Sequence, residues 1–181
     1  MYKILDNENP LLRQISEEVD HSAFGEPWLK ELADNLLAIM KETSAVGVAA
    51  PQVGIHKRII VFGTAYTKTR KVELEIPNTV LINPCYKVLS DEKQIDYEGC
   101  LNVPETCALV PRAMEIEYSG YYLDGTSVTV QARGLEARIL QHEIDHLDGI
   151  LFLDRIEDPS SITTLTALRK KRDYEQSINQ E

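Results

Sequence analysis

The segment QHEIDHLDG, Gln141–Gly149, constrains the fold more strongly than any other stretch of the chain. Residues four apart on a helix share a face, so His142 and His146 can both point at one cation. Glu143 then lies about 100° round the helix, near the cation without ligating it, as a base acting on water beside a metal must. Apolar neighbours favour a buried helix; they are Leu140, Ile144 and Leu147. The segment therefore predicts a buried metal-binding helix.

The third ligand is left open by this segment, because two imidazoles do not complete a catalytic site. His-Glu-x-x-His-x-x-Gly opens the signature of one group of zinc proteases, but Phe152 stands where that signature needs its third histidine. A zinc peptidase with an acidic third ligand stays open, given Asp154, Glu157 and Asp158 downstream. Cys100 is the other candidate, since thiolates bind borderline cations well, although a free cysteine is usually just a small buried hydrophobe.

Two further polar side chains are candidates for supporting roles. Metal-bound histidines usually donate their second N–H to an acceptor, and Asp145 is a candidate for that acceptor. The alternative is that Asp145 is a solvent-exposed carboxylate on the helix without such a role. The small residues of AVGVAAPQVG, Ala45–Gly54, let the backbone approach a ligand closely. Within that segment Gln52 offers a neutral amide donor suited to an oxyanion. A tightly packed helix exit is the alternative interpretation of this segment.

The order of expected elements indicates an α+β fold. Helices are expected over about residues 27–43, 134–148 and 162–175. Strands are expected over residues 58–62, 72–76, 79–82, 115–118 and 127–132, with a hairpin turn at Asp124-Gly125. Because helices and strands do not alternate, we expect antiparallel sheets packed around the metal-binding helix, with helices near both ends of the chain. No repeat or linker interrupts the sequence, so residues 1–181 are expected to form a single domain.

Charge and composition narrow the classes of partner. The net charge of −10 argues against direct binding of nucleic acid, apart from one local basic cluster at Leu168–Arg172. No apolar run is long enough for a membrane span, and no secretory or transit signal is visible. Three cysteines without a signal favour a reducing compartment. The expected location is the cytoplasm of a bacterium, or an organelle matrix if a transit peptide has been removed.

Three motifs in fixed order resemble those of the peptide deformylases. They are VGVAAPQ at Val46–Gln52, EGCLN at Glu98–Asn102 and QHEIDH at Gln141–His146. The resemblance also includes INP at 82–84, VPR at 110–112 and LDGILFLDRI after the metal helix. Three positions depart from the family pattern. Ala45 replaces a glycine, Asn102 replaces a serine, and Cys107 lies near the place where many bacterial relatives have an arginine that holds the substrate peptide.

The resemblance implies hydrolysis of the N-formyl group from the initiator methionine of new polypeptides, with release of formate. It implies one divalent metal ion per chain, Fe²⁺ above all, replaceable by Zn²⁺, Ni²⁺ or Co²⁺. The implied ligands are Cys100, His142 and His146. Glu143 is the implied base, and the Gln52 amide and the backbone N–H of Leu101 are the implied donors to the formyl oxygen.

The same resemblance implies where the substrate lies. An N-formylmethionyl peptide is expected to add as an extended strand beside this chain. The residues expected along it are Val46, Gly47, Glu98, Gly99 and Ile139. The basic cluster near the C-terminus suggests docking at the ribosome, as a C-terminal helix does in some relatives.

Overall fold

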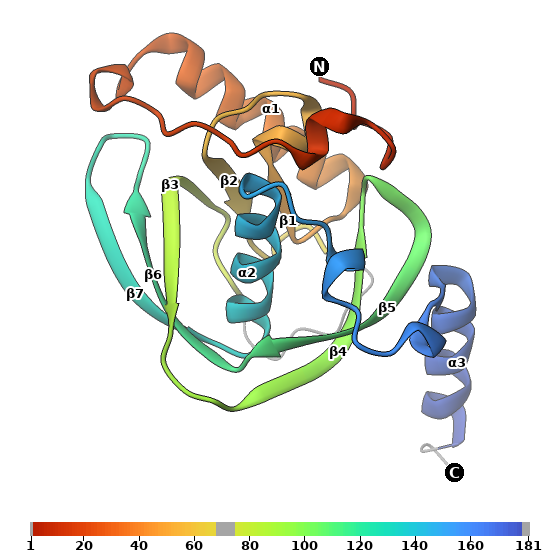
Figure 1. The fold of residues 1–181 in the computed structure, drawn as a ribbon. Coiled ribbons are helices and arrows are strands. Elements are labelled where there is room, and N and C mark those ends of the chain that lie inside the picture. Colours follow the sequence, from red (N-terminus) through yellow and green to blue (C-terminus); the bar gives the residue numbers. More distant parts are fainter. Residues whose placement is uncertain (1, 68–74, 179–181) are drawn as a thin grey trace.

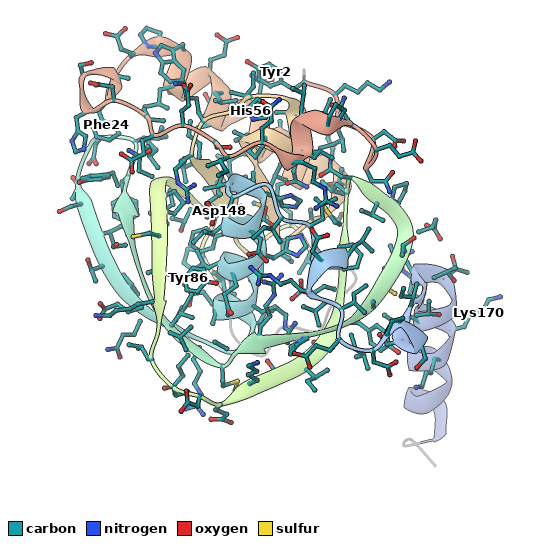
Figure 2. All side chains as sticks on the ribbon, in the orientation of Figure 1. Tyr2, Phe24, His56, Tyr86, Asp148 and Lys170 are labelled. Carbon is teal, nitrogen blue, oxygen red and sulfur yellow. The ribbon has the colours of Figure 1, made fainter. Side chains whose placement is uncertain are left out.

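The computed structural model describes residues 2–67 and 75–178, with side chains described up to residue 171 (Figures 1 and 2). Within these residues the fold has three α-helices and eight strands. In chain order they are α1 (Pro27–Thr43), β1 (Gly47–Ala49), β2 (Ile59–Phe62), β3 (Thr79–Val88), β4 (Lys93–Cys100), β5 (Val103–Ala113), β6 (Glu115–Tyr121), β7 (Ser127–Arg133), α2 (Leu135–Leu147), β8 (Thr163–Thr164) and α3 (Leu165–Ile178).

Two antiparallel sheets enclose helix α2. One sheet has the strand order β1-β2-β3-β6-β7, and the other has the order β4-β5-β8. Figure 1 shows α2 in the middle of the molecule, with the strands curving around it and α1 beyond β1 and β2. The expected α+β fold with antiparallel sheets around a central helix is therefore confirmed. None of the described helices has the length and apolar character that crossing a membrane requires.

Local sequence explains where the helices begin and end. Pro27 occupies the first turn of α1, and Ser44 ends that helix in the left-handed conformation with φ 55°. A buried apolar stripe runs along α1; it consists of Leu29, Leu32, Leu36, Ile39 and Met40. Helix α2 follows Gly134, whose positive φ of 59° turns the chain from β7 into the core. Leu140, Ile144 and Leu147 then bury α2, as expected.

Most of the expected strands are present, but the sheet that carries Cys100 was not predicted. The expected segments over 58–62, 79–82, 115–118 and 127–132 lie on β2, β3, β6 and β7, and Gly125 forms the expected turn with φ 83°. Residues 72–74 lie outside the described part of the chain, and 75–76 are not in a strand. The sequence did not indicate β1, β4, β5 or β8. The third helix begins at Leu165 rather than near residue 162, because Thr163 and Thr164 form β8.

Candidate metal centre and catalytic cleft

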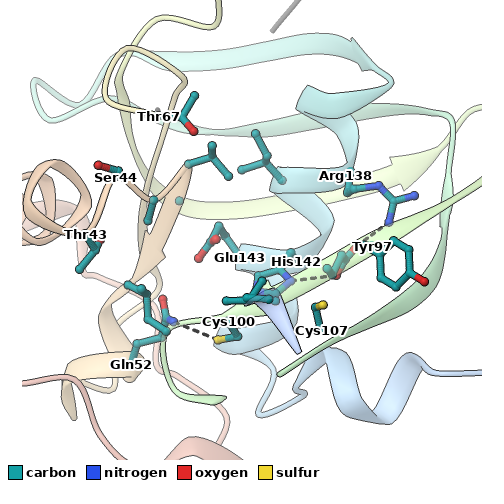
Figure 3. Close-up of a pocket in the computed structure, with 18 of the residues that line it drawn as sticks. Thr43, Ser44, Gln52, Thr67, Tyr97, Cys100, Cys107, Arg138, His142 and Glu143 are labelled. Atoms are coloured by element: carbon teal, nitrogen blue, oxygen red, sulfur yellow. Dashed lines mark hydrogen bonds and ion pairs between the residues drawn. The ribbon is translucent and has the colours of Figure 1, made fainter. Parts of the chain in front are cut away.

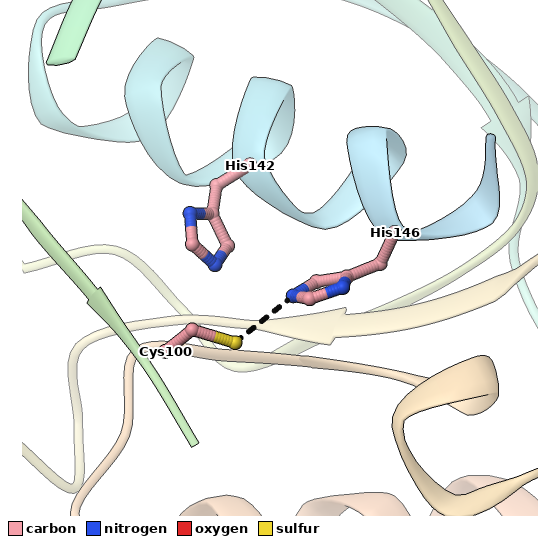
Figure 4. Close-up of side chains that lie close together, drawn as sticks. All are labelled: Cys100, His142 and His146. Carbon is pink, nitrogen blue, oxygen red and sulfur yellow. Dashed lines mark hydrogen bonds between the residues drawn. The ribbon is translucent and has the colours of Figure 1, made fainter. Parts of the chain in front are cut away.

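Cys100, His142 and His146 lie together, with one potential ligand atom each, and these atoms are within 4.8 Å of one another. The two histidines lie one helical turn apart on α2, with ring centroids separated by 5.1 Å. Cys100 ends β4 at a break in the β4–β5 register, which carries its sulfur to the helix. Figure 4 shows the Sγ of Cys100 facing Nε2 of His146, at 3.3 Å. Two segments far apart in sequence thus build one cluster.

The chemistry of this donor set fits a divalent transition metal. A thiolate and two imidazoles suit iron, zinc, nickel or cobalt, and three protein ligands leave a position open for chemistry. Burial lowers the pKa of His146 well below its usual value, which favours the neutral imidazole that binds cations. Within the described residues, this is the one cluster of three such side chains close enough to share an ion.

Glu98 orients His142. Its Oε2 lies 2.9 Å from Nδ1 of His142. Burial raises the pKa of Glu98, but hydrogen bonds from His142 and Arg112 outweigh it and hold that pKa far below the usual value. An ionised carboxylate only accepts, so Nδ1 of His142 carries the proton and Nε2 would be the atom able to bind a cation.

A buried network of arginines and carboxylates supports Glu98. Arg112 donates from Nε and Nη2 to the two oxygens of Glu98, both at 2.9 Å, and Arg138 donates to Glu98 at 2.7 Å. Asp145 accepts from Arg112 and Arg155. Both alternatives considered for Asp145 are therefore wrong, because it is buried rather than solvated and pairs with arginines rather than with a histidine; Glu98 pairs with His142 instead. The roles of Arg112 and Arg138 were missed, because their partners are distant in sequence.

Glu143 lies beside the cluster without belonging to it. Its side chain is almost completely buried, and Oε2 has no hydrogen-bond partner among the described residues. Burial raises the pKa of Glu143 to about 7, in the range that suits a general base near neutral pH. The Glu143 carboxyl faces Gly47 on β1. Because glycine has no Cβ, residue 47 leaves the space that the carboxyl occupies.

Gly47→Ala should impair catalysis through Glu143. A Cβ at position 47 would fall well inside contact distance of Glu143 Oε1, so the carboxyl must move. A base displaced by about 1 Å can cost about 100-fold in kcat. The measurement is a double-mutant cycle on kcat. In a protein that already carries Glu143→Ala, adding Gly47→Ala should reduce kcat only slightly further. Full additivity of the two losses would show that Gly47 acts independently of Glu143.

Gln52 is held by three polar contacts beside Cys100. Its Oε1 accepts from the backbone N–H of Ala49 at 2.8 Å, which fixes the orientation of the amide. Its Nε2 donates to Oδ1 of Asn102 at 2.7 Å and lies 3.4 Å from Sγ of Cys100. Asn102 is itself buried and donates to the carbonyl oxygen of Leu5 at 2.8 Å. Asn102, which stands where the family pattern has serine, therefore hydrogen-bonds Gln52 and anchors the N-terminal segment at Leu5.

These groups line one cleft (Figure 3). Its walls come from the segment after α1, the end of β4, helix α2 and helix α3. Of the residues predicted at the site, His146 is fully buried and does not line this cleft. All the others line it: Val46, Gly47, Gln52, Glu98, Gly99, Cys100, Leu101, Ile139, His142 and Glu143. The predicted residues are thus brought together, although the carboxylate of Glu98 is occupied by its three protein partners.

Phe152 lies where the protease signature would need a ligand, and it is buried against the cluster. Its ring stacks on His142, with centroids 6.3 Å apart and planes at 22°. The first carboxylate downstream, Asp154, accepts from Arg13 and from the backbone N–H of Leu151 instead. The alternative of a zinc peptidase with a downstream ligand therefore has no support in this geometry.

Comparison with known proteins identifies the family. The family model of polypeptide deformylase matches residues 1–161. Peptide deformylase 1 of Bordetella pertussis is 37% identical over 87% of this chain and 89% of its own length. Peptide deformylase 1A, chloroplastic/mitochondrial, of Arabidopsis thaliana is 34% identical over 85% of this chain and 61% of its own length.

A solved structure agrees with these sequences. The Met-Ala-Ser-bound class I type b peptide deformylase from Acinetobacter baumannii has a TM-score of 0.80 to this chain, with 35% identity over 86% of this chain and 98% of that one. The chain therefore belongs to the polypeptide deformylases, the metal-dependent hydrolases that remove the N-formyl group from newly made polypeptides.

Proposed function

We propose that Cys100, His142 and His146 hold one catalytic metal ion, and that Glu143, Gln52 and the backbone N–H of Leu101 act with it in deformylation. The observation that carries this proposal is the cluster of three ligand atoms, with the Glu143 carboxyl in the same cleft but outside the cluster. The resemblance to the deformylases implies Fe²⁺ as the native ion, replaceable by Zn²⁺, Ni²⁺ or Co²⁺, and the mixed thiolate and imidazole donors are compatible with each of these ions. The bound ion supplies Lewis-acid activation of water and of the formyl oxygen.

Glu143 is the proton carrier in this proposal. Its buried carboxyl accepts the proton of the attacking water and returns it to the amine that leaves as formate is released. Because the carboxyl lies outside the ligand set, it stays free for both transfers. Its raised pKa is consistent with that double role.

Gln52 and Leu101 are the proposed donors to the formyl oxygen. Charge develops on that oxygen as its carbon becomes tetrahedral, so preorganised donors stabilise the transition state more than the substrate. The amide of Gln52 is already oriented by Ala49 and Asn102 and needs little rearrangement. Leu101 follows the ligand Cys100 directly and lines the same cleft.

The substrate peptide is proposed to add to β1. Among the described strands, β1 stands at the edge of its sheet and pairs with β2 only. An extended peptide along Val46 and Gly47 would place its methionine toward Ile139, with Glu98 and Gly99 on the opposite wall. Backbone pairing accepts varied sequences, which suits an enzyme that processes many nascent chains.

Incubation of the metal-loaded protein with formyl-Met-Ala-Ser tests the function. We expect formate and Met-Ala-Ser in equal amounts, with no cleavage of the internal peptide bonds. The matched control is acetyl-Met-Ala-Ser, which should react far more slowly if the cleft is built around a formyl group. Internal cleavage without formate would instead support a peptidase.

We also propose a cellular location and docking at the ribosome. Relatives from a bacterium and from plant organelles are consistent with bacterial cytoplasm or an organelle matrix, which cell fractionation would distinguish. The basic residues 169–172 of α3 are proposed to help docking at the ribosome. Truncation after Ser160 should then reduce co-sedimentation with ribosomes, and unchanged co-sedimentation would remove that role.

A further inference from the structure

Helix α3 forms an outer wall of the cleft, although it lies beyond residue 161, where the match to the family model ends. Strand β8 ties the segment to β5, with Thr163 opposite Cys107 and Thr164 opposite Thr106. The first turn of α3 is anchored by a hydrogen bond from Thr166 Oγ1 to Glu105 at 3.0 Å. Figure 1 shows α3 beside β4 and β5 at the edge of the molecule.

The face of α3 that lines the cleft consists of Leu165, Leu168 and Arg169. Residues at spacings of three and four share a helix face, so these three project together. Leu168 is buried. Leu165 lies beside Gly99, where an added Cβ would be 3.5 Å from Leu165 Cδ2, and Gly99 precedes the proposed ligand Cys100. Arg169 lies about one helical turn, or about 5 Å, beyond Leu165 along the axis of α3. The same distance spans between one and two residues of an extended substrate peptide.

Arg169 differs from the other charged residues of the cleft in its exposure. Arg138 is buried and donates to Glu98 and to two backbone carbonyls, while Glu98 and Glu143 are buried below the cleft surface. Arg169 is exposed to solvent, and in the described part of the chain no carboxylate forms an ion pair with it. In a chain of net charge −10, Arg169 therefore places an available cation at the mouth of the cleft.

We propose that Arg169 is a specificity-determining residue that favours formyl peptides with a carboxylate at one of the two positions after the methionine. This inference rests on the proposed function. Solvent-exposed ion pairs are weak, so the expected preference for Asp over Lys at the responsive position is about threefold in kcat/KM. The preference should act through KM, because Arg169 is distant from the reacting bond.

The test compares kcat/KM for formyl-Met-Asp-Ser with formyl-Met-Lys-Ser, and for formyl-Met-Ala-Asp with formyl-Met-Ala-Lys. We expect Arg169→Glu to invert the ratio in at least one pair, and an ionic strength of about 1 M to abolish it. Lys170→Glu is the matched control, because it makes the same charge change one residue along. Figure 2 shows Lys170 pointing away from the molecule, so this variant should keep the wild-type ratio.

Two outcomes would overturn the inference. Ratios near one for both wild-type pairs would show that no carboxylate is selected, and equal shifts in Arg169→Glu and Lys170→Glu would show only a long-range effect of net charge. Either result leaves the proposed function intact if formate is still released from formyl-Met-Ala-Ser. Loss of formate release in the wild-type protein would contradict the proposed function instead.

Discussion

Glu143→Gln should retain the metal and lose about 10²- to 10⁴-fold in kcat, the range that a positioned general base contributes. The amide has nearly the same shape as the carboxyl, and Glu143 lies outside the cluster of ligand atoms, so metal binding should be unaffected. Formate release under metal saturation, together with metal content by elemental analysis, measures both parts of this prediction.

Glu136→Gln is the matched control for this variant. Glu136 lies in the first turn of the same helix, is half-buried and does not line the cleft. This variant should keep wild-type kcat. Wild-type turnover in Glu143→Gln would remove Glu143 from the mechanism, and loss of metal from Glu143→Gln would indicate that the carboxyl helps to hold the ion.

Arg112→Met should destabilise the fold by about 3 to 5 kcal/mol, because it leaves two buried carboxylates short of their shared cation. Arg112 contacts Glu98 and Asp145, and all three side chains are at most 5% exposed. Glu98 would also lose one of the two arginines that hold it against His142, so metal affinity should fall by about 10- to 100-fold. Urea unfolding at saturating metal, with a separate metal titration, distinguishes the two effects.

Arg133→Met provides the contrast for Arg112→Met. Arg133 also faces two carboxylates, Glu92 at 3.9 Å and Glu115 at 3.0 Å, but its side chain is 63% exposed. Loss of the Arg133 side-chain charge should therefore lower the free energy of unfolding by less than about 1 kcal/mol. If the two variants unfold at the same urea concentration, burial of the network does not determine its contribution to stability.

The local parts of the site could be predicted because they depend on spacing along one element. His142, Glu143 and His146 lie within a single helix, and the periodicity of a helix fixes which of them share a face. Cys100 could not be chosen from spacing, since a lone cysteine has many roles; the resemblance to a family singled it out. The structure then placed its sulfur beside His146.

The supporting network could not be predicted because tertiary contacts determine which charges meet. Asp145 is adjacent in sequence to His146, yet its carboxylate turns to Arg112 and Arg155, while Glu98 reaches His142 from another strand. Strands β4 and β5 were missed for a related reason. Pro104 and Pro111 interrupt the pattern of β5, and β4 contains Glu98, whose charge the buried Arg112 and Arg138 neutralise.

The absorption spectrum of the Co²⁺-loaded protein tests the metal centre most directly, because a thiolate ligand adds a sulfur-to-metal charge-transfer band that nitrogen and oxygen ligands lack. The chain has three cysteines, so Cys85→Ser and Cys107→Ser are matched controls for Cys100→Ser. We predict the band in the wild-type protein and in both controls, and its absence in Cys100→Ser together with weakened metal retention. A band that persists in Cys100→Ser would contradict a centre built from Cys100, His142 and His146.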